Sequence, residues 1–367
     1  MKILNLELKN YRNCKNLFLD LSSEKVLIIG KNAQGKTNIL ESIYFLSTLK
    51  SPRITTNVEL INFNEEEVSV CANIIKSDTE TDLSFSYNRE KSRELKINKV
   101  KTTPKNFKSV LKTVLFSTND LLLLRGNPSD RRDWLDRAIS QIYPAYDERL
   151  SKYDKIRIQK NNCLKDYLKT GNLNETLLEV YNEQLAITGS NIIYLRIKFL
   201  KEIEKIAQEK HHTISNTEEL KIKYENSFVD SEDDPEKIIE KFKIALVEKR
   251  QEELRRGQAC VGPHRDDIIF YIDGNEATKF ASQGQQRTVV LALKLSELDI
   301  ITAKTGDEPI LLLDDVLAEL DDIRQNYLLK SIDSATQTII TSVDTVLFED
   351  EFLDNVKIYN IESGNIK

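Results

Sequence analysis

The chain has 367 residues, is 40% hydrophobic and carries a formal net charge of −6. This length allows more than one domain, and no apolar run approaches the roughly 18 residues of a membrane span, so we expect no membrane association. An acidic chain offers no overall attraction to nucleic acid, so such a surface would have to be a local patch. The first residues alternate like a strand and lack a signal-peptide layout, so we expect a cytoplasmic protein.

The first strong pattern is Gly30-Lys31-Asn32-Ala33-Gln34-Gly35-Lys36-Thr37, which fits G-x-x-x-x-G-K-T at every position. Residues 26–29 are an apolar run typical of a buried strand, and apolar residues after Thr37 recur with helical spacing. A loop between a strand and a helix N-terminus turns backbone N–H groups toward an anion. We expect Lys36 to reach the β- and γ-phosphates of a nucleotide and Thr37 to ligate Mg²⁺.

Two segments beside this loop are candidates for binding. Arg12 and Asn13 follow the first predicted strand, either as a polar hairpin turn or as residues near the nucleotide. Residues 89–112 are strongly basic and form either a DNA-backbone patch or a hairpin edge protected by lysines. The DNA-contact candidates are Arg53, Lys96, Lys99, Lys101, Lys105 and Lys108.

The middle of the chain changes to helical periodicity. From about residue 145 to 256, apolar residues recur at three and four positions, with breaks near Gly171 and in the acidic segment 226–235. Just before this region, Arg131 and Arg132 lie among Asp130, Asp133 and Asp136, and the spacing favours local ion pairs.

The last third carries a second polar site. Four apolar residues run into Asp314 and Asp315, and a carboxylate at the end of a buried strand is placed for ligand binding in open α/β sheets. We expect Asp314 to hold Mg²⁺ and Asp315 to act as the general base that orients water. Ser282-Gln283-Gly284-Gln285-Gln286 opens a helix and forms a second anion site, which predicts a head-to-tail dimer with Ser282 on the partner's γ-phosphate.

These motifs carry a family resemblance. The segment from Ser282 resembles the signature motif of the ABC ATPases, and Ala318 to Asp321 resembles their D-loop. More narrowly, the chain resembles the RecF family of bacterial DNA replication and repair proteins. The matching segments, in family order, are Leu8-Lys9-Asn10-Tyr11-Arg12-Asn13, Asn32 to Asn38, Gly262-Pro263-His264-Arg265-Asp266-Asp267, Ser282 to Arg287 and Leu313 to Asp321.

The resemblance implies an α/β ABC-type P-loop ATPase head, assembled from residues 1–115 and 258–367, with a helical arm inserted at 116–257. It implies ATP and Mg²⁺ as cofactors, ATP-driven homodimerisation, and binding to double-stranded and gapped DNA at the nucleoid. It also implies that the protein acts together with RecR and RecO to load RecA.

Three positions depart from general ABC sites. Asp315 stands where a glutamate is usual, Thr341 or Ser342 stands in place of the switch histidine, and Asn119 is the nearest amide to a Q-loop glutamine. A shorter base and a missing contact both reduce transition-state stabilisation, so we expect slow hydrolysis that acts as a switch.

Three other functions compete with this one. An SMC-like repair ATPase would need a longer and less broken coiled coil than residues 145–256. A transporter subunit would explain Tyr11 upstream of the loop as an adenine-stacking residue, but the separation of Thr37 from Ser282 is large for that class. A nucleotide kinase would not need the segment that begins at Ser282.

Overall fold

The computed structural model describes residues 1–51, 53–54, 56–90, 93–332 and 336–367. The chain divides into two compact units. Unit 1 comprises Met1–Leu122, Thr213–Ser215 and Arg287–Lys367, and unit 2 comprises Leu123–His212 and Asn216–Gln286. Residues from both ends of the chain therefore meet in unit 1.

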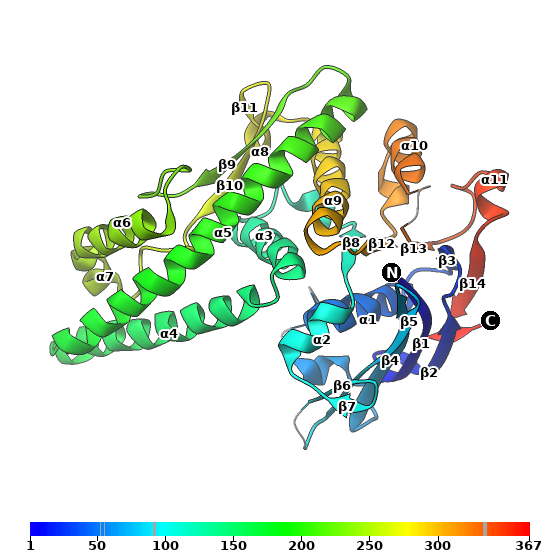
Figure 1. The fold of residues 1–367 in the computed structure, drawn as a ribbon, viewed down its shortest axis with the longest axis horizontal. Helices are drawn as coiled ribbons and strands as arrows, with labels where there is room; N and C mark the ends of the chain where they lie inside the picture. The colour runs from blue at the N-terminus through cyan, green and yellow to red at the C-terminus, as the bar shows by residue number, and fades with distance from the viewer. Residues whose placement is uncertain (52, 55, 91–92, 333–335) are drawn as a thin grey trace. The chain divides into compact units, whose positions relative to one another are not determined.

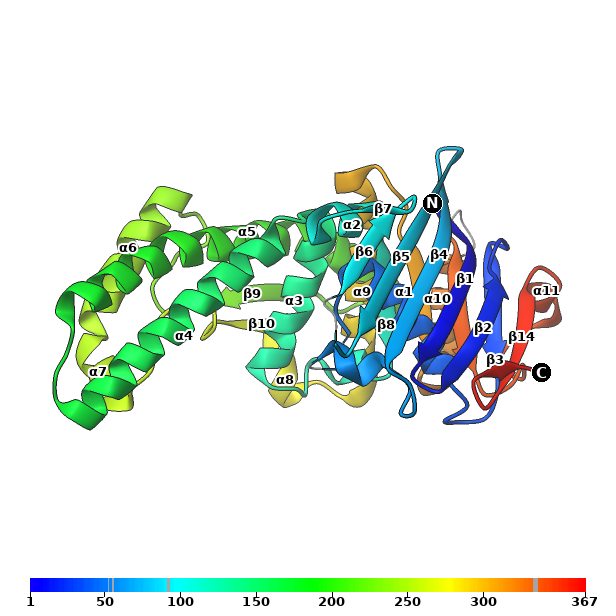
Figure 2. The ribbon, with the colours of Figure 1, turned by 90° about the horizontal axis from the view of Figure 1, so that it is seen from below.

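Unit 1 contains an antiparallel sheet of six strands in the order β2-β1-β4-β5-β6-β7. Its strands alternate buried and exposed residues, as expected for a sheet with one face on a core. The bounds are β1 (Lys2–Tyr11), β2 (Cys14–Asp20), β4 (Glu67–Lys76), β5 (Thr79–Asn88), β6 (Glu94–Ile97) and β7 (Val100–Lys101), with the short helix η1 (Asn57–Leu60) before β4. Figure 2 shows the broad face of this sheet, with α1 behind it.

The second sheet of unit 1 has the order β15-β14-β3-β13-β12-β8, and all its pairings are parallel except β14 with β15. Its strands are β3 (Lys25–Ile29), β8 (Thr113–Ser117), β12 (Ile310–Asp314), β13 (Thr338–Ser342), β14 (Lys357–Glu362) and β15 (Asn365–Ile366). β3 lies between two strands from the C-terminal part of the chain. This pairing confirms that the α/β head is assembled from both chain ends.

The helix α1 (Lys36–Thr48) packs between the two sheets and is buried almost all round. Phe45 of α1 meets Phe85 of β5 edge to face, with ring centroids 4.7 Å apart. Further helices of unit 1 are α2 (Pro104–Val110), η2 (Asp120–Leu122), η3 (Leu317–Glu319), α10 (Asp322–Ser331) and α11 (Asp350–Leu353). α9 (Gln283–Thr305) begins in unit 2 and continues in unit 1.

Unit 2 is mainly helical. Its helices are α3 (Pro128–Ile142), α4 (Tyr146–Thr170), α5 (Glu175–Ser215), α6 (Pro235–Glu248), α7 (Arg250–Arg256) and α8 (Ala277–Phe280). α4 and α5 form a long hairpin joined by residues 171–174, and the hairpin is coloured in greens in Figure 1. A small sheet in the order β11-β10-β9 completes the unit, from β9 (Leu220–Glu225), β10 (Asp267–Ile272) and β11 (Asn275–Glu276).

The strand β9 corrects the prediction that residues 145–256 are helical apart from breaks near Gly171 and at 226–235. Leu220 and Ile222 are buried while Lys221 and Lys223 are exposed, and β9 pairs with β10 along its whole length. The domain limits at residues 115 and 257 stay predictions. In the compact units, 116–122 belong to unit 1 and 258–286 to unit 2.

Among the described residues, no helix combines the length and apolar character that crossing a bilayer requires.

Candidate nucleotide site and the signature segment

The loop 30–37 connects β3 to α1, as the sequence predicts. Gly30 and Gly35 have φ of 155° and 112°. A Cβ at Gly30 would collide with the carbonyl oxygen of Ile361, and a Cβ at Gly35 would lie 2.8 Å from the side chain of Asn13. Glycine is therefore required at both positions, by backbone conformation and by space. Lys31, Asn32 and Ala33 form the exposed tip of the loop, and Gln34 is half-buried.

Lys36 is buried, and its ammonium group lies under the loop. Nζ donates to the carbonyl oxygen of Gly30 at 2.8 Å and lies 3.7 Å from Oδ2 of Asp315. The positive charge is thus held between loop backbone and carboxylate, at the base of a turn whose N–H groups suit an anion.

Thr37 and Asp314 come together at the ends of α1 and β12. The Thr37 hydroxyl donates to Oδ1 of Asp314 at 3.0 Å, and the Thr341 hydroxyl donates to the same oxygen at 3.0 Å. Burial raises the pKa of Asp314, against the lowering effect of these two hydroxyls. A hydroxyl and a carboxylate oxygen are the ligand types that Mg²⁺ prefers, so this pair fits the predicted metal site.

Asp315 has a strained backbone, with φ of 52°. This left-handed conformation is uncommon for residues other than glycine and is concentrated at functional sites. Its N–H donates to the Thr341 hydroxyl at 2.9 Å, while Oδ1 is buried and has no hydrogen-bond partner among the described residues. An orphaned buried carboxylate oxygen is costly, which marks Asp315 as a group shaped for a ligand. Whether Thr341 or Ser342 stands in place of the switch histidine stays a prediction.

Asn13 contacts the loop directly. Its amide donates to the carbonyl oxygen of Gln34 at 3.1 Å, and its side-chain oxygen accepts from Asn38 at 2.7 Å. The C-terminal hairpin of β14 and β15 contacts the same part of the loop, because the N–H of Gly364 donates to the Gln34 carbonyl oxygen at 2.8 Å. Both ends of the chain therefore fix the loop.

Arg12 follows β1, and its side chain contacts α1. Its guanidinium makes a two-point ion pair with Glu41, at 3.0 and 2.6 Å. Arg53 reaches the same carboxylate at 3.2 Å and donates to Asn38 at 2.9 Å. Glu41 was not identified from the sequence, although a carboxylate one turn after Thr37 in an apolar helix was a usable signal. A nucleotide contact by Arg12 stays a prediction.

The signature segment opens α9, which confirms its predicted position at a helix start. Ser282 and Gln283 are exposed, and Gly284 and Gln285 are half-buried. The Ser282 hydroxyl accepts from the N–H of Gln285 at 3.2 Å, and the Gln285 side chain accepts from the N–H of Ser282 at 2.8 Å. This reciprocal cap presents the segment at the surface.

Asp321 caps α10, where its carboxylate accepts from the N–H of Arg324 at 3.0 Å and pairs with the Arg324 guanidinium. Glu319, two residues earlier, pairs with Arg287 at 3.0 Å. The predicted D-loop is thus tied to the second turn of α9 within unit 1.

The predicted DNA-contact residues differ in their surroundings. Lys96 and Lys101 both pair with Glu94, at 2.6 and 2.7 Å, and Lys99 lies in the turn between β6 and β7. Because β7 is the edge of its sheet, this arrangement matches the hairpin-edge alternative. Lys105 is exposed on α2, whereas Lys108 is buried. The prediction that Lys108 lies on an exposed basic patch is therefore wrong, because α2 packs that residue inward.

Comparisons with known proteins agree with this geometry. The family model described as the RecF/RecN/SMC N terminal domain matches residues 2–367. The chain is 37% identical to the DNA replication and repair protein RecF of Bacillus subtilis (strain 168), over 99% of each chain. It is 38% identical to RecF of Staphylococcus carnosus (strain TM300), over 100% of both.

A solved structure described as the recombination mediator protein RecF-ATP in the RecFOR pathway superposes with a TM-score of 0.91. The sequences are 35% identical, and the match covers 100% of this chain and 97% of the other. With relatives matched over their full lengths and a family model over almost every residue, the chain belongs to the RecF family of DNA replication and repair proteins.

Proposed function

We propose that this protein is an ATP-dependent DNA-binding switch of recombinational repair and replication restart. It binds ATP and Mg²⁺, dimerises, and holds double-stranded DNA next to single-stranded gaps. Hydrolysis is slow and sets how long the protein stays on DNA. In this proposal it acts with RecR and RecO to load RecA, in the cytoplasm at the nucleoid.

The observation that carries the proposal is the convergence of Lys36, Thr37, Asp314 and Asp315 on one loop. Lys36 and Thr37 come from the start of α1, and the two aspartates come from the end of β12. The hydrogen bond between Thr37 and Asp314 joins residues 277 positions apart in the chain. Packing alone does not explain this constellation, since it leaves one buried carboxylate oxygen of Asp315 without a hydrogen-bond partner in the described part of the chain. It suits a polyphosphate and a hard cation together.

Each residue has a distinct role in this proposal. ATP supplies the reactive γ-phosphoryl group, and Mg²⁺ neutralises its charge. Loop N–H groups and Lys36 hold the phosphates, while Thr37 and Asp314 hold the metal. Asp315 orients the attacking water and accepts its proton. Thr341 keeps both aspartates in place through its hydroxyl, which accepts from one and donates to the other.

The dimer follows from the second anion site. Ser282 and its neighbours are exposed at a helix N-terminus, which presents N–H groups to a phosphate. We propose that Ser282, Gln283, Gly284 and Gln285 cap the nucleotide held by a second copy, with Asp321 alongside. The solved RecF-ATP structure, which this chain matches over its full length, is described as an ATP form. That description supports the nucleotide and leaves the dimer to experiment.

A DNA-binding titration with and without a non-hydrolysable ATP analogue tests the proposal. We expect the analogue to raise affinity for a gapped duplex by about tenfold, about 1.4 kcal/mol of coupling, with a smaller effect on single strands. Lys36→Ala should remove the effect of the analogue. Identical curves with and without the analogue would contradict a switch, and absence of any DNA binding would contradict the whole proposal.

A further inference from the structure

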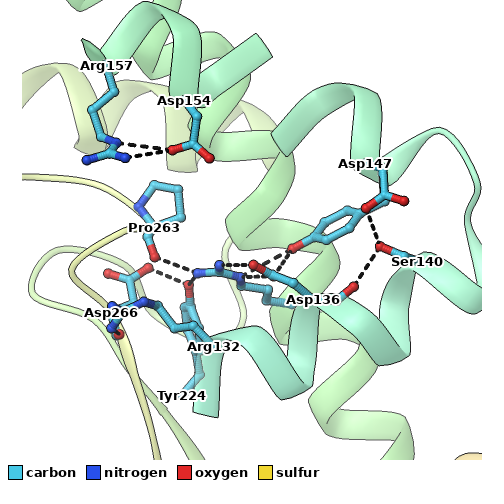
Figure 3. Close-up of polar contacts among 11 residues, drawn as sticks. Arg132, Asp136, Ser140, Asp147, Asp154, Arg157, Tyr224, Pro263 and Asp266 are labelled. Carbon is cyan, nitrogen blue, oxygen red and sulfur yellow. Dashed lines mark hydrogen bonds and ion pairs between the residues drawn. The ribbon is translucent and has the colours of Figure 1, made fainter. Parts of the chain in front are cut away.

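Unit 2 contains a polar hollow of about 360 Å³ that the nucleotide-binding proposal does not use. It lies between α3, α4 and the loop 258–265, and arginines from all three reach it: Arg132, Arg157 and Arg265. The loop includes most of the segment Gly262-Pro263-His264-Arg265-Asp266-Asp267, one of the family-matching segments. Figure 3 shows Arg132 and Pro263 on one side, with Asp154 and Arg157 of α4 across from them.

The loop is fixed before any ligand arrives. Gly262 has φ of 125°, and a Cβ there would collide with the hydroxyl of Tyr153 and the ring of Phe242. The Tyr153 hydroxyl hydrogen-bonds to Nδ1 of His264 at 2.7 Å, and Nε2 of His264 lies 3.2 Å from the carbonyl oxygen of Ala259. The loop cannot shift without breaking these contacts, so the side chains around the hollow are preorganised.

Two kinds of arginine line the hollow. Arg157 is paired with Asp154 at 2.9 Å, and Arg196 makes a two-point pair with Asp136 at 2.9 and 2.8 Å. These guanidinium groups are neutralised by their own carboxylates.

Arg132 and Arg265 are held differently. Arg132 donates to the carbonyl oxygen of Asp266 at 2.7 Å, and Arg265 donates to that of Ala259 at 3.1 Å. Within the described residues, neither guanidinium has a carboxylate at ion-pair distance. A backbone carbonyl orients a guanidinium without forming an ion pair, so both keep donors for an anion. The carboxylates of Asp267, Asp266 and Asp133 act on Arg132 only from beyond ion-pair distance.

The helix α4, which lines the hollow with Tyr153, Asp154 and Arg157, is basic over its whole length. α4 carries seven lysines and arginines against four aspartates and glutamates, on a chain whose net charge is −6. Arg149, Lys152, Lys155 and Arg157 follow one another within its first half, and Lys152 and Lys155 are exposed. Lys160 is buried against Glu253, and Arg157 is paired with Asp154. The exposed positive charge of α4 therefore comes from residues outside the hollow, such as Lys152 and Lys155.

We propose that this hollow binds a phosphate group of the DNA backbone, with Arg132 and Arg265 as its ligands. Planar guanidinium groups match phosphate oxygens in two-point contacts. The lining holds four arginines and three aspartates, and Asp154 and Asp136 are already paired with Arg157 and Arg196. This polar lining suits a phosphodiester better than a base, which would need apolar or aromatic walls. This inference rests on the proposed DNA-binding function and adds a specific contact in unit 2 to it.

The test compares Arg265→Gln and Arg132→Lys with Arg250→Gln, a charge-matched control. Arg250 is in α7, pairs with Glu175 and does not line the hollow. The probes are a blunt duplex, a gapped duplex and polyglutamate, titrated by fluorescence anisotropy at several salt concentrations. We expect Arg265→Gln to weaken duplex binding about tenfold and reduce the salt slope by about 1. Arg132→Lys keeps the charge but loses the fork, and should weaken binding by a smaller factor.

The outcomes separate this inference from the function on which it rests. If the wild-type protein binds duplex and both variants match the Arg250→Gln control, the hollow is not a DNA site although the proposed function stands. If the variants lose polyglutamate and keep duplex, the hollow binds an acidic protein segment and the inference is overturned. If the wild-type protein binds no DNA, the proposed function fails first. Thermal melting of each variant shows whether a loss reflects unfolding; Arg265 is exposed, so its variant should melt as the wild type does.

Discussion

The phosphate loop of unit 1 and the polar interior of unit 2 place charges in opposite ways. In the loop, Lys36 lies 3.7 Å from Asp315, a carboxylate with one oxygen unpaired. In unit 2, Lys160 and Glu253 are almost fully buried and lie 2.6 Å apart, and the second oxygen of Glu253 accepts from the N–H of Cys260 at 2.9 Å. The first arrangement leaves groups for a ligand, whereas the second satisfies them within the fold.

This difference distinguishes charged residues that bind a ligand from charged residues that stabilise the fold. A buried charge whose donors and acceptors are all used stabilises or specifies the fold. A charge that is positioned but incompletely satisfied is a candidate for binding or catalysis. By this criterion Arg132 and Arg265 resemble the loop residues more than they resemble Arg196, which is fully engaged with Asp136 and the carbonyl of Pro263.

Substitution of Asp315, beside the phosphate loop, should have the largest effect, a loss of ATP turnover. Asp315→Asn keeps the size of the side chain and removes the proposed base, so ATP turnover should fall by about 10² to 10⁴-fold. Nucleotide binding should persist, because Lys36 and Thr37 are unchanged, and the ATP-bound dimer should accumulate on DNA. Steady-state phosphate release and ATP affinity measure the two effects. Turnover near the wild-type rate would remove Asp315 as the base and weaken the contrast between the two regions.

The free energy of unfolding tests whether the buried pair of Lys160 and Glu253 stabilises unit 2. Glu253→Gln leaves the Lys160 ammonium buried without its counter-charge, where burial already lowers the pKa of Lys160. The free energy of unfolding should fall by about 3 kcal/mol, as measured by urea denaturation. Glu252→Gln is the matched control, since Glu252 pairs with Lys249 near the surface and should change nothing measurable. Equal stabilities for the two variants would mean that the buried pair does not support unit 2.

A smaller effect concerns pH. Burial lowers the pKa of His264 to about 3, and Arg157, Arg265 and Arg132 act in the same direction. The unfolded chain binds a proton near pH 6.5 while the folded protein does not, so stability is complete above that pH and declines as the pH falls toward 3. From pH 7 to pH 5 this histidine should remove about 2 kcal/mol from the free energy of unfolding.

His264→Gln isolates that contribution. The variant should lose about 2 kcal/mol less than the wild type over the same interval, when both are unfolded in urea at pH 7 and pH 5. Parallel pH profiles would show that His264 is as easily protonated in the folded protein as in the unfolded chain.

The sequence was informative where the chemistry is local. The loop 30–37 and the strand ending at Asp314 and Asp315 could be predicted because consecutive residues define their backbone and their charge. The start of α9 at the signature segment was predictable for the same reason: Ser282 and Gln285 cap it over one turn.

The sequence was less informative where distant residues decide. Local spacing favours pairs of Arg131 with neighbouring aspartates, yet Arg131 makes a two-point pair with Asp267 at 2.8 and 2.7 Å, 136 positions away. Asp130 is used instead to cap α3, where it accepts from the N–H of Asn127. The sequence did not indicate β9 for a related reason. Its alternation of buried and exposed residues is short and includes several charged residues, and the strand is stabilised by pairing with the distant strand β10. No spacing in the sequence relates the hollow's arginines to one another.

We propose that the nucleotide bound by one copy is capped by Ser282 of a second copy, and sedimentation can show whether this dimer forms. Sedimentation velocity of the wild type and of Ser282→Arg should be compared with ATP and with a non-hydrolysable analogue. The substituted side chain would occupy the space of the γ-phosphate contact while leaving the loop 30–37 unchanged. We expect a nucleotide-dependent dimer for the wild type and a monomer for the variant, with equal nucleotide affinity. Dimers of equal strength in both proteins would contradict it.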